Sequence, residues 1–186
     1  MVKHKSPAKQ QNTTIDKSLI TDVVRDFYFL IVTKNRPAAL AFTLNKLKVQ
    51  IDLSVHEVLV FIDGCKATEE LVSQYDWVQW EVAKKSISAS PARNALYKKA
   101  KGEIFIGLDD DAHPITADFI AKVQSQFDSN KTLGVIAFQE IRGVFDTDEM
   151  ALSHFKEKDS YFTNDFIGCG FAIKKSVYQQ TNGFPV

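Results

Sequence analysis

Three consecutive aspartates, Asp109, Asp110 and Asp111, are the residues whose type and spacing most clearly indicate chemistry in this chain. Adjacent carboxylates repel one another, so a triplet at the end of an apolar run lowers stability unless a cation compensates its charge. Hard carboxylate oxygens suit Mg²⁺ or Mn²⁺. Along an extended strand, Asp109 and Asp111 would point to one side and Asp110 to the other. The pattern predicts a divalent cation held by Asp109 and Asp111, with a solvated acidic turn as the alternative.

Phosphate is the ligand that such a cation would most readily bind, because two carboxylates leave coordination positions that diphosphate oxygens typically fill. The sequence contains neither glycine-rich phosphate loop, GxxxxGK[ST] or GxGxxG. Cationic side chains would therefore have to hold the phosphate. Arg93 is the main candidate, because it lies in the first turn of a helix predicted to begin at Ser90-Pro91, where N–H groups also favour an anion. An ordinary surface arginine is the alternative.

Other polar residues also follow apolar runs. Asp63-Gly64 comes after Val58–Ile62, and its carboxylate could accept an N–H group from a nucleobase, although a simple turn explains the pair equally well. Thr33 follows Phe27–Val32 and begins the polar segment that contains Asn35 and Arg36. His113 lies two residues after the triplet and is either a metal ligand or an ordinary loop histidine.

Alternating strand and helix patterns would position these residues. Continuous apolar runs, period-two alternation and helical spacing of leucines define the expected elements. The expected strands are Phe27–Val32, Val58–Ile62, Val78–Val82, Ile104–Leu108, Leu133–Phe138 and Ile167–Ile173, with helices beginning at Pro37, Ser90-Pro91 and Thr116 and a polar, partly helical loop over Glu140–Asp165. This order predicts an α/β fold with a mainly parallel sheet and helices on both faces. Ligands of such sheets bind beyond the carboxyl ends of the strands, where the polar residues above lie.

Composition limits the remaining possibilities. A chain of 186 residues predicts one domain, over 27–186, preceded by a polar, basic leader over 1–26. The balance of 23 basic and 23 acidic residues gives no indication of a nucleic acid partner. Cys65 and Cys169 match no zinc or disulfide pattern and indicate free thiols, hence a cytoplasmic protein. The lysines of the leader are weak evidence for contact with the inner face of a membrane.

Taken together, the ordered motifs resemble the nucleotide-sugar-binding half of the family 2 glycosyltransferases, which have the GT-A fold. The similarity extends from about Phe27 to the last residue. The matching segments are Phe29–Pro37, Val58–Gly64, Ser90–Asn94, Ile106–Asp111, Gly168–Lys175 and Asn182–Phe184. The triplet looks like the DxD element of the family, and Gly168-Cys169-Gly170-Phe171 looks like its acceptor-side segment.

The resemblance implies a role for each matching residue. Thr33 and Asp63 would contact the nucleoside, with Asn35, Arg36 and Asp110 also in the donor site. Arg93 would approach the diphosphate or base, Asp109 the ribose or sugar, and Asp111 the metal. The implied cofactor is Mn²⁺ or Mg²⁺, and a UDP-sugar is the favoured donor. Ile62 departs from the family, which usually has a second acid at this position, so nucleotide preference is left open.

The implied reaction is an inverting, metal-dependent transfer of a sugar from the nucleoside diphosphate sugar to a hydroxyl acceptor. A hydroxyl needs a base to take its proton. In the family this carboxylate lies beyond the segment that matches Asn182–Phe184, so we expect it after Val186 and expect the chain to be C-terminally truncated. The nearest upstream acids, Glu140 and Asp165, do not match it. The alternative is a non-catalytic module that binds the nucleotide sugar, and a nucleotidyltransferase ranks last because Thr33–Pro37 contains no glycine.

Overall fold

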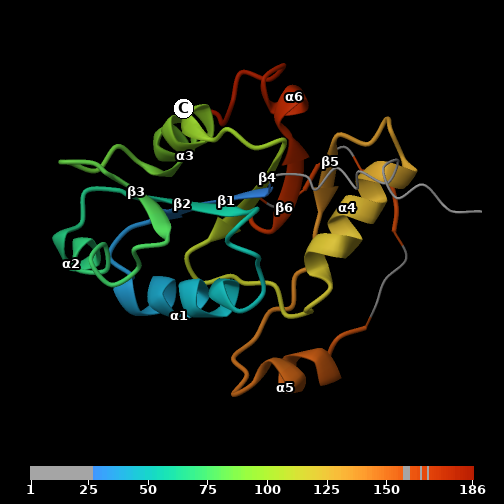
Figure 1. The fold of residues 1–186 in the computed structure, drawn as a ribbon, viewed down its shortest axis with the longest axis horizontal. Helices are drawn as coiled ribbons and strands as arrows, with labels where there is room; N and C mark the ends of the chain where they lie inside the picture. The colour runs from blue at the N-terminus through green and yellow to red at the C-terminus, as the bar shows by residue number, and fades with distance from the viewer. Residues whose placement is uncertain (1–26, 157–159, 164, 167) are drawn as a thin grey trace, which may run out of the picture.

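A single six-stranded sheet forms the centre of the protein. The computed structural model describes residues 27–156, 160–163, 165–166 and 168–186, so the predicted leader and Ile167 lie outside the described residues. The strand order is β3-β2-β1-β4-β6-β5 (Figure 1). The strands are β1 (Phe27–Thr33), β2 (Glu57–Ile62), β3 (Val78–Val82), β4 (Ile104–Asp109), β5 (Val135–Ala137) and β6 (Phe171–Lys174). β1 to β4 pair in parallel with one another, whereas β6 is antiparallel to both β4 and β5. The mainly parallel sheet predicted from the sequence is confirmed.

Helices cover both faces of this sheet, as Figure 1 shows. The helices are α1 (Pro37–Lys48), α2 (Lys66–Glu69), α3 (Ala89–Lys99), α4 (Phe119–Ser129), α5 (Asp148–Ser153) and α6 (Lys175–Tyr178). Alternate side chains of β1 enter two separate cores, because successive residues of a strand point to opposite faces. Phe29 and its face pack against α1 and α4, while Leu30 and the other face pack against α3 and α6. The central strands are therefore buried on both sides, which explains their continuous apolar sequences.

Several element boundaries differ from the sequence prediction. Strand β5 covers only Val135–Ala137 of the predicted Leu133–Phe138. Helix α3 begins at Ala89 with Ser88 at the N-cap, not at Ser90-Pro91. Ser88 makes no side-chain capping bond; instead, the carboxylate of Asp63 accepts the N–H of the preceding residue, Ile87, at 2.6 Å. Helix α4 begins at Phe119, three residues after the predicted Thr116. Strand β6 begins at Phe171, because the glycine-containing segment before it does not join the ladder.

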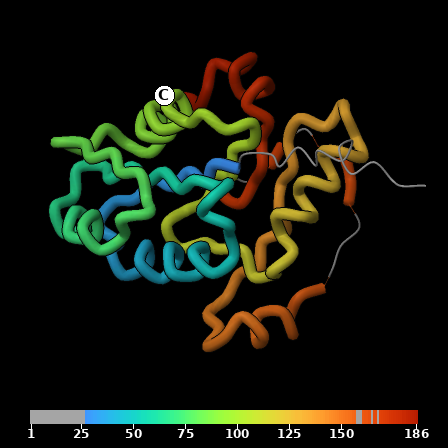
Figure 2. Tube along the Cα trace, viewed as in Figure 1, coloured from blue at the N-terminus to red at the C-terminus, as the bar shows by residue number. Residues whose placement is uncertain are grey.

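The strand register brings the carboxyl ends of three parallel strands to one edge. Thr33 is paired with Ile62, the residue before Asp63, and Val32 is paired with Asp109. The end of the described chain runs back from α6 to lie beside α3 (Figure 2). Among the described residues, no helix is both long and apolar enough to cross a bilayer.

Candidate functional site

A cleft of about 370 Å³ opens at the edge where β1, β2 and β4 end. It is lined by Val32, Thr33, Lys34, Arg36, Asp63, Ser86, Ser88, Ala89, Asp109 and Asp110. Five of the predicted donor-site residues are in this lining, and Arg93 reaches it through its contact with Asp109. Asn35 lies in the turn between β1 and α1 with a φ of 58°, a left-handed conformation that asparagine tolerates better than most residues.

Asp110 is the buried member of the acidic triplet. Only 4% of the residue is exposed, and Thr33 donates a hydrogen bond to its carboxylate at 2.7 Å. Thr43, on α1, donates to its backbone carbonyl at 3.0 Å. Burial raises the pKa of Asp110, while the bond from Thr33 and the charge of Arg36 partly offset that rise. These contacts connect β1, α1 and the acidic turn, so Asp110 holds the elements of the cleft together.

Two arginines provide the positive charge that the acidic triplet requires. Arg36 pairs with Asp110, at 3.0 Å, and also with Asp111. Arg93 pairs with Asp109 at 2.8 Å. Asp109 and Asp111 therefore pair with different arginines in this arrangement. The alternation of an extended strand does not relate the two carboxylates, because β4 ends at Asp109 and the next two residues form a turn.

Asp63 forms the wall of the cleft opposite the triplet. Its two carboxylate oxygens accept hydrogen bonds from the Ser86 hydroxyl, at 2.6 Å, and from the Ile87 N–H, at 2.6 Å. Burial alone would raise the pKa of Asp63, but the hydrogen bonds from Ser86, Ile87 and Ser88 outweigh it and hold that pKa below its ordinary value. Asp63 thus fixes the loop immediately before α3.

The serines of this loop are the cleft residues that sequence reasoning missed. Ser86 and Ser88 line the cleft, and Lys34 donates to the Ser86 hydroxyl at 3.0 Å. Their position in the sequence could have identified them, because the loop follows the carboxyl end of β3, the edge at which ligands of parallel sheets bind. Nothing in their residue types distinguishes them from ordinary loop serines.

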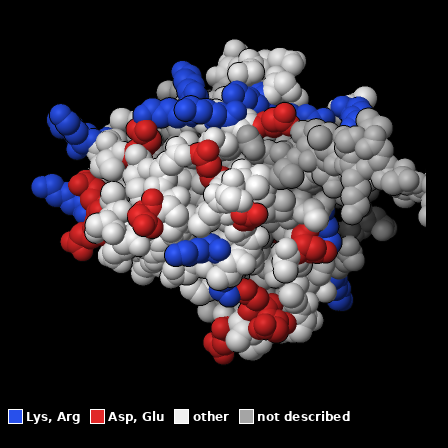
Figure 3. Space-filling model, in the orientation of Figure 1, with Lys and Arg blue, Asp and Glu red and all other residues white. Residues whose placement is uncertain are grey.

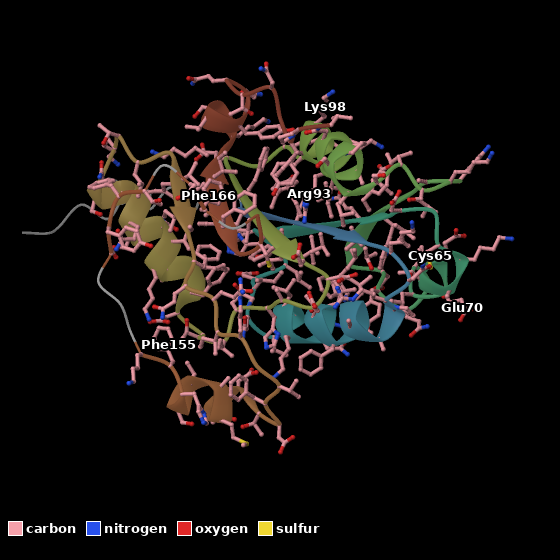
Figure 4. All side chains as sticks on the ribbon, turned by 180° about the vertical axis from the view of Figure 1, so that it is seen from behind. Cys65, Glu70, Arg93, Lys98, Phe155 and Phe166 are labelled. Atoms are coloured by element: carbon pink, nitrogen blue, oxygen red, sulfur yellow. The ribbon has the colours of Figure 1, made fainter. Side chains whose placement is uncertain are left out.

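Arg93 contacts both a carboxylate and an aromatic ring. Figure 4 shows it reaching from α3 toward the sheet, whereas Lys98 on the same helix points away. The centroid of the Phe184 ring lies 5.8 Å from the Arg93 guanidinium carbon. The neighbouring Asn94 fixes Phe184 by donating to its carbonyl at 2.9 Å and accepting its N–H at 2.8 Å. The Asn182–Phe184 segment therefore packs against Arg93, one of the predicted donor-site residues.

A second cleft, of about 420 Å³, lies beside the predicted acceptor segment. It is lined by Ala137, Phe138, Glu140, Tyr161, Thr163, Asp165, Phe166 and Cys169. Burial raises the pKa of the Cys169 thiol to about 11, so it is protonated at neutral pH. Phe171 does not line this cleft, because its ring is buried in the core beside Tyr97. Gly168 and Gly170 flank the thiol in the chain, and Gly170 has a φ of 70°.

His113 contacts the carboxylate of Asp148. Its Nε2 lies 3.1 Å from the Asp148 carboxylate on α5, which Lys46 of α1 also contacts at 2.7 Å. The histidine therefore joins α5 to the loop that follows the triplet, and the structure gives it no contact with the carboxylates that were predicted to bind metal.

The triplet carries a donor set that fits a divalent cation completed by other ligands. The side chains of Asp109 and Asp111 are 39% and 49% exposed, so both carboxylates are accessible to an ion from solvent, and Asp109 also lines the cleft. No group of three or more His, Cys, Asp or Glu side chains converges as a metal cluster within the described part of the chain. Mg²⁺ and Mn²⁺ accept such a site, because they are commonly bound through one or two carboxylates together with substrate phosphates and water.

Comparison with known proteins places this arrangement in context. The sequence model of Glycosyl transferase family 2 matches residues 28–180, which is most of the chain. No curated protein matches the sequence. The matched region contains all the cleft residues described above.

Solved structures match the fold. The mannosyltransferase PcManGT from Pyrobaculum calidifontis, in complex with GDP-Man and Mn²⁺, is 20% identical with a TM-score of 0.68 over 86% of this chain and 47% of that one. TarS residues 1–349 from S. aureus, in complex with UDP-GlcNAc, is 20% identical with a TM-score of 0.66 over 86% of this chain and 48% of that one. The GT-A fold expected from the sequence is confirmed, and the chain spans about half the length of these proteins.

Proposed function

Since this chain belongs to glycosyl transferase family 2, we propose that its cleft binds a nucleoside diphosphate sugar and that the domain takes part in inverting transfer of the sugar to a hydroxyl acceptor. The observation that supports this best is the convergence of Thr33, Asp63 and the acidic turn on one cleft at the carboxyl ends of parallel strands. Nucleotides bind at this edge in open α/β sheets. The family match and the mixed charge of the cleft favour the same ligand class.

The chain's own residues divide the donor between two walls. On the Asp63 side, the serine hydroxyls of the loop before α3 and the buried Asp63 present polar groups suited to a nucleoside. On the triplet side, Arg36 and Arg93 supply guanidinium groups that match phosphate oxygens in geometry and charge. We assign the diphosphate to these arginines and the nucleoside to the Asp63 side.

Asp109 and Asp111 are the residues that would hold a divalent cation, and their exposed carboxylates favour this role over that of Asp110. Bound there, the cation would neutralise the negative charge that develops on the leaving diphosphate. The structure of PcManGT with GDP-Man and Mn²⁺ supports manganese as the first ion to test. We place the acceptor at the second cleft, because Cys169 of the acceptor-side segment lines it.

Calorimetric titration of the chain with UDP and with GDP, each with and without Mn²⁺, tests the donor site. We expect metal-dependent binding of at least one nucleotide, and its loss in Asp111→Ala. Asp118→Ala is the matched control, because this exposed carboxylate pairs with Lys122 on α4 and does not line the cleft. The absence of metal-dependent binding to either nucleotide would refute the proposal.

Turnover separates a transferase from a module that only binds. The same chain is incubated with UDP-GlcNAc or GDP-mannose and Mn²⁺, and release of the free nucleotide is measured. Release above that of Asp111→Ala supports sugar transfer or donor hydrolysis by the described domain. Binding without release favours the non-catalytic alternative for this chain.

A further inference from the structure

Arg36 joins two carboxylates that differ in their surroundings. One guanidinium nitrogen, Nη1, lies 3.0 Å from the Asp110 carboxylate, and Nη2 pairs with Asp111. The Asp110 side chain is 5% exposed, whereas that of Asp111 is 49% exposed. The two contacts of the Arg36 guanidinium thus form a fork. One half of this fork pairs with a buried acid and the other half pairs with an acid in contact with solvent.

The buried half of the fork is anchored by the fold. Asp110 also accepts a hydrogen bond from Thr33 and holds Thr43 of α1 through its backbone carbonyl. Arg36 itself is fixed in the backbone as the N-cap residue of α1, between Asn35 with its left-handed φ and Pro37 in the first helical turn. Both partners of this contact are therefore held in place by residues outside the acidic turn.

The exposed half of the fork is more easily broken. An ion pair between solvent-exposed groups contributes only about 0–1 kcal/mol, because water and salt screen it. The Asp111 carboxylate is also the group best placed to bind a divalent cation in the proposed function. A guanidinium and a divalent cation that use the same carboxylate oxygens compete for them, because each is positive and repels the other.

We propose that Arg36 is an internal counter-ion that sets the metal affinity of this site. With no metal bound, its guanidinium neutralises Asp111. When a divalent cation binds, the Nη2 arm leaves Asp111 while the Nη1 arm stays on Asp110. The site consequently has a low affinity for the metal ion alone. Its affinity becomes high only when diphosphate is present, because the diphosphate adds ligands to the ion and gives the released guanidinium arm a new anionic partner. This inference rests on the proposed donor site and adds a residue that regulates it.

Mn²⁺ alone, without nucleotide, is the probe that isolates this effect. Free Mn²⁺ is measured by electron paramagnetic resonance during titration of the full chain and of Arg36→Gln and Arg36→Lys. We expect Arg36→Gln to bind Mn²⁺ at least about threefold more tightly than the unmodified chain, because removal of one cation beside the acids lifts competition and repulsion. Arg36→Lys should lie between the two, since it retains the charge but not the fork.

Lys131→Gln is the matched control, because it removes one positive charge that is paired with Asp128 at the end of α4 and not with the triplet. Its Mn²⁺ affinity should equal that of the unmodified chain. The proposal is overturned if Arg36→Gln binds Mn²⁺ no more tightly than the unmodified chain, including the case in which neither binds. Metal-dependent nucleotide binding by the unmodified chain is measured separately, so a failure of the donor-site proposal is distinguishable from a failure of this one.

A second measurement requires no variant at position 36. The Nε–Hε signal of Arg36 is followed by NMR while diamagnetic Mg²⁺ is added, and the same signal is recorded in Asp111→Asn without metal. We expect Mg²⁺ to move the signal in the direction produced by Asp111→Asn, because both remove the Asp111 contact. A signal that saturating Mg²⁺ leaves unmoved would contradict displacement of the guanidinium.

Discussion

Asp63 illustrates how one buried carboxylate can organise a binding site. Its oxygens accept hydrogen bonds from Ser86 and Ile87, and only 3% of the residue is exposed. These bonds hold the loop before α3 against the end of β2 and complete one wall of the cleft. A contact to a nucleobase would have to be made in addition to these bonds, so the role of Asp63 that the structure shows is to position the loop.

The lowered pKa of Asp63 predicts a particular dependence of stability on pH. A carboxylate whose pKa is lower in the folded state stabilises the fold above its ordinary pKa, and this contribution is lost as the pH falls through the folded value. We expect Asp63→Asn to reduce the free energy of unfolding at pH 7 by about 1–2 kcal/mol, because it removes the charge but keeps a hydrogen-bonding amide.

Urea unfolding between pH 7 and pH 2 measures this effect. The difference between the unmodified chain and Asp63→Asn should be constant down to the ordinary carboxyl pKa of about 4 and should shrink below it. Asp76→Asn, which alters an exposed carboxylate before β3, provides the control and should change stability little. A difference that persists unchanged at the lowest pH would show that Asp63 acts only through its shape.

At the scale of elements, the approach of two loops defines the width of the cleft. Gly64 follows β2 with a φ of 67°, and a Cβ atom at this position would lie 2.4 Å from the Ser86 nitrogen and 2.6 Å from the Lys85 carbonyl carbon. The two backbones can therefore approach this closely only when residue 64 has no side chain. The DG pair that follows the second strand in the sequence is required by this contact as well as by the turn.

Gly64→Ala should consequently displace the loop before α3. Gly170→Ala is the matched comparison, because Gly170 has a φ of 70° but its Cβ would meet nothing closer than 3.7 Å. We expect about 1–2 kcal/mol of destabilisation in Gly170→Ala from backbone strain alone, and a larger loss in Gly64→Ala from strain plus the clash. Thermal or urea unfolding of both variants gives the comparison. Equal losses would indicate that the loop moves aside freely.

At the scale of the whole molecule, a net charge of zero conceals an uneven distribution. On the face shown in Figure 3, Lys and Arg side chains line the edge over α3, while Asp and Glu gather over α5. The arginines and acids of the cleft are a third, internally paired group. Overall neutrality therefore says little about affinity for an anionic nucleotide, which depends on charges within a few ångströms of the site.

Ligand binding should stabilise the entire domain, because the cleft is built from β1, β2, β4 and the helices that follow them. Binding only to the folded state adds about 2.7 kcal/mol at a ligand concentration of 100 times Kd. For a chain of this size we expect Mn²⁺ with its preferred nucleotide to raise Tm by about 5–10 °C. Differential scanning fluorimetry measures the shift. It should disappear in Asp111→Ala, and a comparable rise in that variant would contradict the assigned metal ligand.

Much of the architecture could be predicted from the sequence, because it depends on local pattern. The apolar runs of β1, β2 and β4 specify strands buried on both faces, and the residues that follow them must lie at one edge of a parallel sheet. Thr33, Asp63, Asp109 and Asp110 were therefore brought to one cleft as expected. The assignment of metal and nucleotide roles to these residues stays a prediction.

The partners of those residues were decided only by the tertiary structure. Arg36 meets Asp110 and Asp111 across some 75 positions of sequence, and Asp63 accepts the N–H of Ile87, 24 residues later. No local pattern encodes such pairs, because they depend on how separately specified elements pack against each other. The sequence by itself indicated that the triplet favours a nearby positive charge, since neighbouring like charges repel. The fold decided that guanidinium groups lie there, since only the pairing of β1 with β4 and the packing of α3 on the sheet bring Arg36 and Arg93 within reach.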